Sequence, residues 1–510
     1  MTGTCVRRRP PCPAALGIAS LAGLLMPCPN SATASTGPAP TATADFTEVV
    51  AVIHMHTSLA DGAASPVELA RAARVAGVDA VVITDHFLEK VTYAPWPIGN
   101  VLGVTVSRPS VLSGGLDRYF DALAAAEKEV PGVLLLPALE VTPYARWTGS
   151  FLLRTLQLEG MHRHVLVIGI EERRALRGLP VAGNLHAGRY GSWSLLFLVP
   201  ALGVLWSAAR MVRPRTREMR LGKFLLRKKK RSITEGLIGV ASLAVLVAGF
   251  PFRVERWSAV GGDPGDAPFR LLEDQVRLLG GVTSWAHPEA AAEKEDHGIK
   301  IATSPYPELV ARTDADAFGA LPEGVKSLLP PGGIWDRALA AHLDGKRATA
   351  PFALAELDEH RGVKEIDLRI LQTVLFVRER SHAGLVEALR SGRMYARWTP
   401  EARPPLRLSA WAAEAPGQPS AISGGSLKGG MPLTLRFAVA GGDGTAVTAR
   451  LVRRGEVIWS ARLVPPFEEH LQDDPSGPTD YRLDIEGAYP YRLISNPIFV
   501  TRPGERREGA

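Results

Sequence analysis

Cysteine is nearly absent from this chain, and it is confined to one end. The 510 residues contain only three cysteines, Cys5, Cys12 and Cys28. The rest of the protein can therefore form no disulfide bond and offers no thiolate to a metal ion. Any metal site in the body of the protein must be built from histidine and carboxylate side chains.

The short motifs of several common enzyme classes are also missing. The sequence contains no GxxxxGK[ST] phosphate loop, no GxGxxG dinucleotide fingerprint and no GxSxG nucleophile turn. Nucleotide-driven enzymes and serine hydrolases are therefore disfavoured. With 46% apolar and 22% charged residues, the chain can still bury a large core, and its length predicts two globular units.

Positive charge is concentrated in two short segments. The formal net charge is +7, but residues 212–232 carry ten Lys or Arg residues against the single Glu218. Three more positive charges come from Arg7, Arg8 and Arg9, which leaves a net charge of about −5 on the remainder. Because the excess is local, it gives no support to a nucleic-acid partner, and we expect none.

The first 34 residues predict an export signal. Three arginines precede an apolar stretch from Ala14 to Met26, and Ala32-Thr33-Ala34 forms a small-x-small cleavage site. An uncleaved anchor or a misassigned start codon is the alternative. Residues 35–46 are rich in Pro, Ala and Thr and predict a flexible linker.

Two apolar runs without a charged residue interrupt the chain, from Gly191 to Ala209 and from Gly236 to Phe252. At 1.5 Å rise per residue, each can just cross a hydrocarbon layer of ~30 Å. We predict transmembrane helices over residues 191–211 and 233–252, joined by a basic cytoplasmic loop at 212–232. The alternative is two buried core helices joined by a solvated basic loop.

The positive loop and the export signal predict the same topology. Short positive loops stay in the cytoplasm, so the segments on either side of the hairpin would lie outside it. The protein is then expected in a bacterial inner membrane, with its catalytic domain facing the periplasm.

Strands and helices alternate on both sides of the hairpin, in residues 47–190 and 253–398. Strands are predicted at 47–54, 79–84, 133–140, 164–168, 282–286 and 348–355, and helices at 66–76, 335–343 and 382–391. Most of these strands end at or near a His, Asp or Glu. In α/β barrels the strand ends converge on one face, so distant residues can share an ion.

The pattern changes to short alternating strands in residues 399–510. Examples are 433–439, 446–450, 457–463 and 481–485. This spacing predicts a β-sandwich domain, whose role the sequence does not indicate.

Seven motifs that contain metal-binding residue types follow one another along the chain. They are His54-Met55-His56, Asp61-Gly62, Thr84-Asp85-His86, Glu140, His164, Ala286-His287-Pro288 and Asp358-Glu359-His360. In this order they resemble the polymerase-and-histidinol-phosphatase (PHP) superfamily. The resemblance covers roughly residues 47–395, apart from the hairpin, and implies a distorted (β/α)7 TIM-like barrel.

The resemblance also implies a site for three divalent ions, which could be zinc, manganese or iron. His54, His56 and Asp358 would hold one ion. Glu140 would bridge it to a second ion, held by His164 and His287, and the third would be held by Asp61, His86 and His360. We assign Asp61, Glu140 and Asp358 as the catalytic carboxylates.

Two neighbouring residues are weaker candidates for this site. His162 is a local alternative to His164, but only His164 enters the apolar strand. Asp85 is expected to orient an imidazole rather than to bind an ion.

The expected reaction is hydrolysis of a phosphate ester by a metal-activated hydroxide. An exported site favours phosphorylated small molecules, envelope glycans or lipid head groups as substrates, and a protein partner is not indicated. Arg390 and Arg393 are the candidate phosphate-binding residues, although a structural role is favoured. The alternative function is a membrane-anchored metal-binding sensor or binding module with little catalysis.

Overall fold

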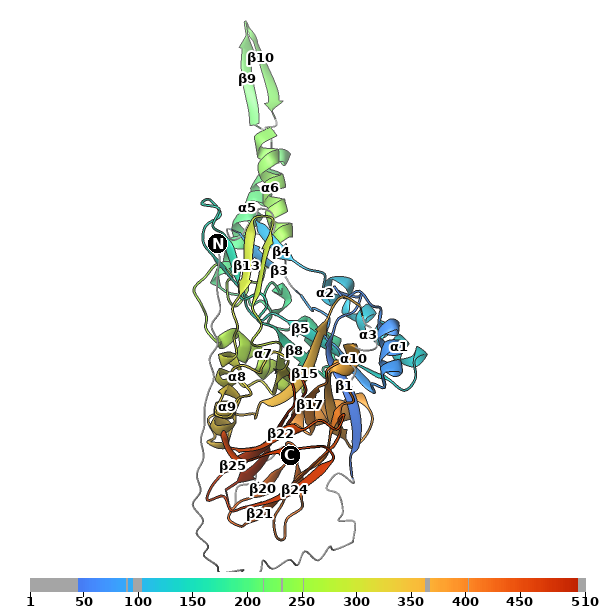
Figure 1. Cartoon of the computed structure of the whole chain (residues 1–510). Helices are drawn as coiled ribbons and strands as arrows, with labels where there is room; N and C mark the ends of the chain where they lie inside the picture. Colours follow the sequence, from blue (N-terminus) through green and yellow to red (C-terminus); the bar gives the residue numbers. More distant parts are fainter. Residues whose placement is uncertain are drawn as a thin grey trace, which may run out of the picture. The chain divides into compact units, whose positions relative to one another are not determined.

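Seven short strands pair edge to edge into a closed ring (Figure 1). The order is β1, β2, β5, β8, β11, β14, β15 and back to β1. Their bounds are Thr47–Met55, Ala80–Ile83, Leu134–Val141, Val165–Ile168, Val282–Trp285, Ala317–Leu321 and Phe352–Glu359. The computed structural model describes residues 45–88, 90–94, 103–213, 215–230, 233–250, 252–362, 367–401 and 403–502. The predicted signal peptide lies outside the described residues.

Strand β8 runs antiparallel to both of its neighbours, β5 and β11. The other neighbouring pairs of the ring are parallel. The N-terminal end of β8 therefore lies at the same end of the ring as the C-terminal ends of the other six strands. This reversal brings His164, the residue before β8, to the end where the other motifs lie.

The helix after β1 shows why local sequence predicts these elements well. Helix α1 spans Pro66–Ala76, as predicted. Ser65 and Glu68 form a capping box at its start, and Gly77 ends it in the left-handed conformation. The apolar face of α1 is buried against the ring.

The predicted strand at 348–355 is shifted, because β15 spans Phe352–Glu359. Arg347 is buried and donates hydrogen bonds to the carbonyl oxygens of Val310 and Ala315, which holds residues before the strand in a turn. The strand continues through acidic residues that point into the site rather than into an apolar core, so the apolar pattern ends before the strand does.

The remaining helices flank the ring or lie between its strands. They are α2 Val111–Gly114, α3 Leu116–Glu129, α4 Arg173–Arg177, α7 Ala267–Leu278, α8 Glu308–Arg312, α9 Ile334–Leu343, α10 Asp367–Ile370 and α11 His382–Ser391. The 3-10 helices are Leu185–Ala187 and Ser192–Phe197.

Two small sheets are formed by segments between the ring strands. Strands β3 (Lys90–Tyr93) and β4 (Val104–Ser107) form a hairpin. A four-stranded sheet has the order β12, β13, β7, β6, with bounds Ala292–Asp296, Ile299–Thr303, Gln157–Glu159 and Arg146–Thr148. Both sheets contribute to a small apolar cluster that is separate from the core of the ring.

The segment between β8 and β11 contains two apolar helices, α5 (Leu198–Val212) and α6 (Ile233–Gly249). Within the described ranges, one helical stretch, Ser194–Val212, is long and apolar enough to cross a membrane, and α6 is a shorter apolar helix. The helices are not buried in the protein: Leu205 is 66% exposed and Val240 is 68% exposed. The alternative of two buried core helices is therefore wrong.

Small residues let α5 and α6 approach each other closely. A Cβ atom on Gly203 would lie 2.4 Å from Ser242 Oγ, and one on Gly239 would lie 2.3 Å from Ser207 Oγ. Ser207 Oγ also donates a 2.6 Å hydrogen bond to the carbonyl oxygen of Glu235. The polar and small side chains thus face the partner helix, while the large apolar ones face outward.

The basic segment between the helices, which was predicted as a loop, contains regular secondary structure. It contains an antiparallel hairpin of β9 (Arg215–Leu221) and β10 (Phe224–Lys230). Gly222, with a φ of 61°, stands at the turn. A two-residue turn with a left-handed glycine suits a hairpin, and this turn signal was overlooked beside the charge pattern.

The C-terminal residues form β-strands, as the alternating pattern predicted. The strands are β16 Leu371–Val377, β17 Met394–Trp398, β18 Leu406–Glu414, β19 Ala421–Ile422, β20 Ser426–Lys428, β21 Leu433–Gly441, β22 Val447–Arg453, β23 Glu456–Leu463, β24 Phe467–Asp473, β25 Thr479–Glu486, β26 Arg492–Ser495 and β27 Ile498–Thr501. One sheet continues from β1 through β16, β17, β26, β25 and β22 to β23, and β19, β18, β21 and β24 form another. Side chains of both sheets share one apolar core.

Asp480 in β25 carries a buried carboxylate that should make stability depend on pH. It is 1% exposed, and among the described residues neither carboxylate oxygen has a hydrogen-bond partner. Burial raises its pKa to about 7. The folded protein therefore binds a proton that the unfolded chain releases near pH 4, and stability should fall as pH rises from about 4 to 7.

We expect Asp480→Asn to raise the free energy of unfolding at pH 8 by up to about 4 kcal/mol. At pH 4, where the native carboxyl group is already neutral, the two proteins should be nearly equal. Denaturant unfolding at both pH values measures this difference. Exposed Asp474→Asn is the control and should change neither value; an equal effect of Asp480→Asn at pH 4 and pH 8 would contradict the explanation.

Candidate metal centre

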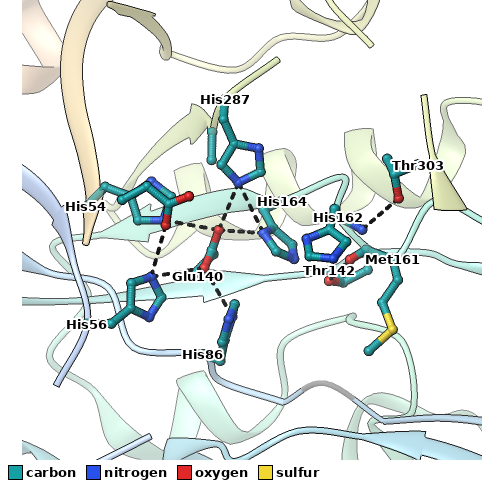
Figure 2. Close-up of polar contacts among 12 residues, drawn as sticks. His54, His56, His86, Glu140, Thr142, Met161, His162, His164, His287 and Thr303 are labelled. Carbon is teal, nitrogen blue, oxygen red and sulfur yellow. Dashed lines mark hydrogen bonds and ion pairs between the residues drawn. The ribbon is translucent and has the colours of Figure 1, made fainter. Parts of the chain in front are cut away.

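The nine predicted ligands lie together at one end of the ring, and Figure 2 shows Glu140 with His54, His56, His86, His164 and His287 around it. They come from segments far apart in the sequence and fall into overlapping groups whose donor atoms lie within 4.8 Å of one another. The groups contain His54, His56, Asp61, His86, Glu140, His164, His287, Asp358 and His360. The order of motifs along the chain therefore identified residues that meet in space.

Glu140 occupies the centre of the cluster and is 1% exposed. Its Oε1 atom lies 3.1 Å from His54 Nε2, 2.5 Å from His164 Nδ1 and 3.3 Å from His287 Nε2. Its Oε2 atom lies near a second pair of imidazoles: the distances are 3.3 Å to His56 Nε2 and 3.1 Å to His86 Nδ1. The two oxygens thus face different groups of nitrogen donors, as a bridging carboxylate requires.

Asp61 organises another part of the cluster. Its Oδ1 atom lies 3.3 Å from His56 Nδ1. Its Oδ2 atom lies 3.4 Å from His86 Nε2 and 3.3 Å from His360 Nδ1. Three nitrogens around one carboxylate form a complete donor set for a divalent ion.

Asp358 lies on the more open side of the cluster. Its Oδ1 atom is 3.3 Å from His54 Nε2, 3.7 Å from His56 Nε2 and 2.9 Å from His360 Nε2. The side chain is 39% exposed, whereas His54 and His56 are buried. A ligand that enters from solvent would therefore meet Asp358 first.

The backbone is strained at three of these residues. His54, His287 and Asp358 have φ values of 71°, 30° and 53°. Non-glycine residues rarely adopt this region, and such strain is found at functional sites. At His54 the pairing register of β1 shifts between Ile53 and Met55, so a bulge directs His54 into the site.

Several buried donor atoms fit a bound metal better than a hydrogen-bond network. His54 Nε2, both ring nitrogens of His56, Asp61 Oδ1 and Glu140 Oε2 are buried and make no hydrogen bond of acceptable geometry among the described residues. They nevertheless approach one another to 3.1–3.3 Å. Atoms that converge without aligning as donor and acceptor suit a shared cation, and the oxygen and nitrogen donors suit zinc, manganese or iron.

The charges in the cluster also favour a bound metal ion. Burial alone would raise the pKa of Glu140, but His164, His54 and His86 hold it well below its usual range. Burial opposes protonation of His54, yet the charges of Asp358 and Glu140 raise its pKa well above the usual value. The carboxylates therefore remain ionised only with positive charge beside them, which a metal ion can supply.

Glu356 is a buried residue of this site that the sequence analysis missed. It is 2% exposed, and its Oε2 atom lies 3.3 Å from His54 Nδ1. Its Oε1 atom accepts a hydrogen bond from the backbone N–H of His287. Glu356 thus orients one imidazole and the strained backbone of another. Its position two residues before Asp358 on the same strand was an available signal, since such residues share a face.

Tyr306 fixes the tautomer of His287. Its hydroxyl donates a 2.6 Å hydrogen bond to the carbonyl oxygen of Ala286 and lies 3.1 Å from His287 Nδ1. Because the hydroxyl proton is already used, His287 Nδ1 must donate to the tyrosine oxygen. Nε2 of His287 is then unprotonated and faces Glu140, as a metal ligand should be.

Asp85 supports the site through the backbone next to it. It accepts hydrogen bonds of 2.6 Å from Thr57 N and 2.5 Å from Thr57 Oγ1. Burial raises the pKa of Asp85 to about 6. The residue holds the turn that follows His56, so it positions the chain rather than a ring.

His162 lies beside the cluster and lines a cavity of ≈ 290 Å³ together with His287, Glu323 and Asp358. Its backbone N–H donates to Thr303 Oγ1 at 3.1 Å (Figure 2), and its Nε2 lies 3.1 Å from a guanidinium nitrogen of Arg108. His164, not His162, contacts Glu140, as the apolar strand predicted.

The two arginines that we considered as phosphate-binding candidates have structural contacts. Arg390 donates a hydrogen bond to the carbonyl oxygen of Gly280. Arg393 is buried and pairs with Glu387 at 2.8 Å. These contacts favour the structural role for both arginines.

Comparisons with known proteins found weak structural similarities. The chain matches no protein-family model and no curated protein. It is similar to a two-domain protein of Bacteroides vulgatus that contains a predicted PHP-like metal-dependent phosphoesterase. The two are 12% identical, with a TM-score of 0.34 over 92% of this chain and 99% of that chain.

A second solved structure, a proposed metal-dependent phosphoesterase of Bifidobacterium adolescentis, is 14% identical, with a TM-score of 0.26 over 62% of this chain and 88% of that chain. An amidohydrolase of Chromobacterium violaceum is 18% identical, with a TM-score of 0.18 over 47% of this chain and 66% of that chain. The first two names agree with the motif resemblance. Because all three TM-scores are below 0.5, these likenesses carry no argument. The function proposed below rests on the motifs, the closed ring and the donor cluster.

We expect Glu356→Gln to weaken metal binding about 10- to 100-fold, because the amide no longer holds His54 Nδ1–H and the His287 backbone with a charged acceptor. Metal content after dialysis against graded chelator measures this. Glu359→Gln is the matched control, since that side chain accepts a hydrogen bond from the nearby backbone N–H of Arg361. Equal metal retention by the two variants would exclude the orienting role of Glu356.

Proposed function

We propose that the protein is a metal-dependent hydrolase of phosphate esters. The observation that supports this most directly is the complete set of nine nitrogen and oxygen donors centred on Glu140, of which six are buried and Asp61, Asp358 and His360 are partly exposed. A degenerate binding module would be expected to lack some of these ligands, whereas here they converge.

We infer three ion positions from the donor geometry. His54, His56 and Asp358 would hold the first ion, and these three form one of the donor groups. Glu140 would bridge to the second ion with His164 and His287, whose ring nitrogens lie 3.3 Å apart.

Asp61, His86 and His360 would hold the third ion, within a group that also includes His56. Because His56 also lies near Asp61, its imidazole is placed between the first and third positions. The donor set agrees with zinc, manganese or iron.

Bound divalent ions would lower the pKa of a coordinated water and stabilise charge on the phosphoryl oxygens and the leaving group. The protein contributes the placement of the ester. The cavity beside His287 and Asp358 admits it to the open side of the cluster. Arg108, next to His162, supplies a guanidinium near this cavity that suits phosphate oxygens. Asp61, Glu140 and Asp358 keep the ligand field anionic and are the carboxylates that we assign to catalysis.

We also propose that the protein is exported and anchored in a bacterial inner membrane by the α5–α6 hairpin, with the metal centre on the periplasmic side. The outward apolar side chains of both helices and the basic hairpin between them support this arrangement. Phosphorylated small molecules, envelope glycans and lipid head groups are then the accessible substrates.

We infer that the C-terminal strands form a sandwich that supports the barrel. Arg482, buried in β25, pairs with Asp336 of α9 and lies 4.8 Å from the ring centre of Trp335. Asn496 bonds the backbone N–H of Ala353 in β15 at 2.7 Å. These contacts brace β15, the strand that carries Glu356 and Asp358.

The function is tested with a panel of phosphate esters and analysis of bound metals. We expect the purified protein to contain divalent ions and to cleave at least one ester, and a chelator should abolish the activity. The His54→Ala/His56→Ala variant should lose metal and fall to the uncatalysed rate. The His186→Ala variant, altered outside the cluster, should retain both. Bound ions with no ester cleaved would favour the sensor alternative, and full activity in the double variant would exclude the cluster as the catalytic site.

Protease digestion tests the topology. In spheroplasts, the basic hairpin at residues 215–230 should be protected from added protease, because we place it in the cytoplasm. In inside-out vesicles the same segment should be cut. Cleavage in intact spheroplasts would reverse the proposed orientation.

A further inference from the structure

Three consecutive large apolar side chains are exposed at the turn between β6 and β7. Phe151 is 56% exposed, Leu152 89% and Leu153 76%. Contiguous apolar exposure of this kind marks an interaction site more often than a bare surface. We call residues 150–155 the apolar loop.

The apolar loop is a fixed structure, because its own hydrogen bonds hold it. Thr155 N donates to Ser150 O at 3.0 Å, and Ser150 N donates to Thr155 Oγ1 at 3.1 Å. Arg154 N donates to Phe151 O at 3.2 Å. Gly149, with a φ of 77°, lets the turn close, since a Cβ there would lie 2.0 Å from Thr155 O. The three apolar side chains are therefore held outward by the backbone.

The strand that carries this loop is bonded to the segment that follows α6. Trp147 N in β6 donates to Ala259 O at 2.7 Å, and an ion pair of 3.9 Å joins Arg146 to Asp263. The same segment returns to the base of α5, where Val254 and Arg189 form a β-bridge. The strand before the apolar loop is thus bonded to the segment that follows the helical hairpin, and that segment is bonded to the one that precedes the hairpin.

Cationic and aromatic side chains surround this attachment. Arg154 lies in the loop itself, and Arg189 and Arg256 are exposed. The guanidinium of Arg253 lies 5.4 Å from the ring centre of Tyr190, which is 64% exposed. Arginine and tyrosine at the end of apolar helices are typical of the level of lipid head groups.

We infer that the apolar loop inserts Phe151, Leu152 and Leu153 into the same lipid bilayer that holds α5 and α6. This inference rests on the proposed membrane location and extends it. The loop is a second membrane contact, and β7 leads from it directly to the metal centre. His162 lies nine positions after Leu153 in the sequence, so an extended chain bounds their separation at about 30 Å. The metal centre then works close to the membrane surface.

Fluorescence of a single labelled cysteine tests this. The full chain, with Cys5, Cys12 and Cys28 changed to serine, would carry Leu152→Cys labelled with an environment-sensitive nitrobenzoxadiazole dye. It would be reconstituted in vesicles of phosphatidylcholine and phosphatidylglycerol. We expect blue-shifted emission, quenching by spin-labelled lipid and protection from aqueous iodide. Leu278→Cys, at an 87% exposed position on α7, is the matched control and should show quenching by iodide alone.

Each other outcome contradicts the inference. Iodide quenching at position 152 equal to that at 278 would show a loop in water. Protection from iodide without quenching by lipid would show that a protein, such as a second copy of this chain, covers the loop. Failure of the protein to float with vesicles would reject the membrane location itself. None of these readouts needs phosphoester hydrolysis, so they stand apart from a failure of the proposed reaction.

The Leu152→Asp/Leu153→Asp variant supplies a second measurement. This variant should still float with the vesicles through α5 and α6 and keep its metal content. Among the described residues, the loop contacts neither these helices nor the metal cluster. For this measurement the dye would be placed at Ser150→Cys. The neighbouring Gly149 is unsuitable, because its φ is 77° and a Cβ there would collide with Thr155 O. Quenching of the dye by spin-labelled lipid should fall several-fold in the double variant; unchanged quenching would overturn the inference.

Discussion

The structure depends on one buried negative charge. Glu140 lies at the centre of the barrel end, almost without solvent, and five imidazoles approach its two oxygens within 3.3 Å. An isolated carboxylate in this place would be costly, because burial removes it from water. The surrounding residues, including the strained backbone at His54 and His287, are placed so that cations or donors can offset this cost. The fold around them supplies rigidity, because each residue of the cluster lies in a strand of the closed ring or in a segment next to one.

Around this centre, a second group of residues acts only through the ligands. Glu356 holds His54 and the backbone of His287, Tyr306 sets the tautomer of His287, and Asp85 holds the turn after His56. The C-terminal strands also support the site, because Asn496 is hydrogen-bonded to β15, the strand on which Glu356 lies. The site is thus supported from both the barrel and the C-terminal sheets.

Much of this could be predicted from the sequence, for physical reasons. Helix α1 was predicted because its start and end have local signals, and the ligands were predicted because motif order reflects ring order. Glu356 was missed because a buried acid without a motif resembles an exposed one in sequence. The bulge at His54 and the reversal of β8 were not predictable, since both depend on pairing with distant strands. The basic hairpin was missed because its charges suggested a solvated loop, and charge says nothing about backbone pairing.

The bridge between Arg189 and Val254 has a consequence for how such a protein can arise. Two backbone hydrogen bonds of 3.0 Å join these residues. Arg189 lies just before the helical hairpin in the sequence, and Val254 lies just after it. The insertion therefore leaves and re-enters its host at nearly the same point, and closing the host across it requires little rearrangement. Residues 191–252 are thus an insertion that could be exchanged as a unit. A short turn in their place would leave the ring intact, and the same junction could accept another inserted segment. A barrel of this design can gain or lose such a pair of helices without any change in the residues of its donor cluster.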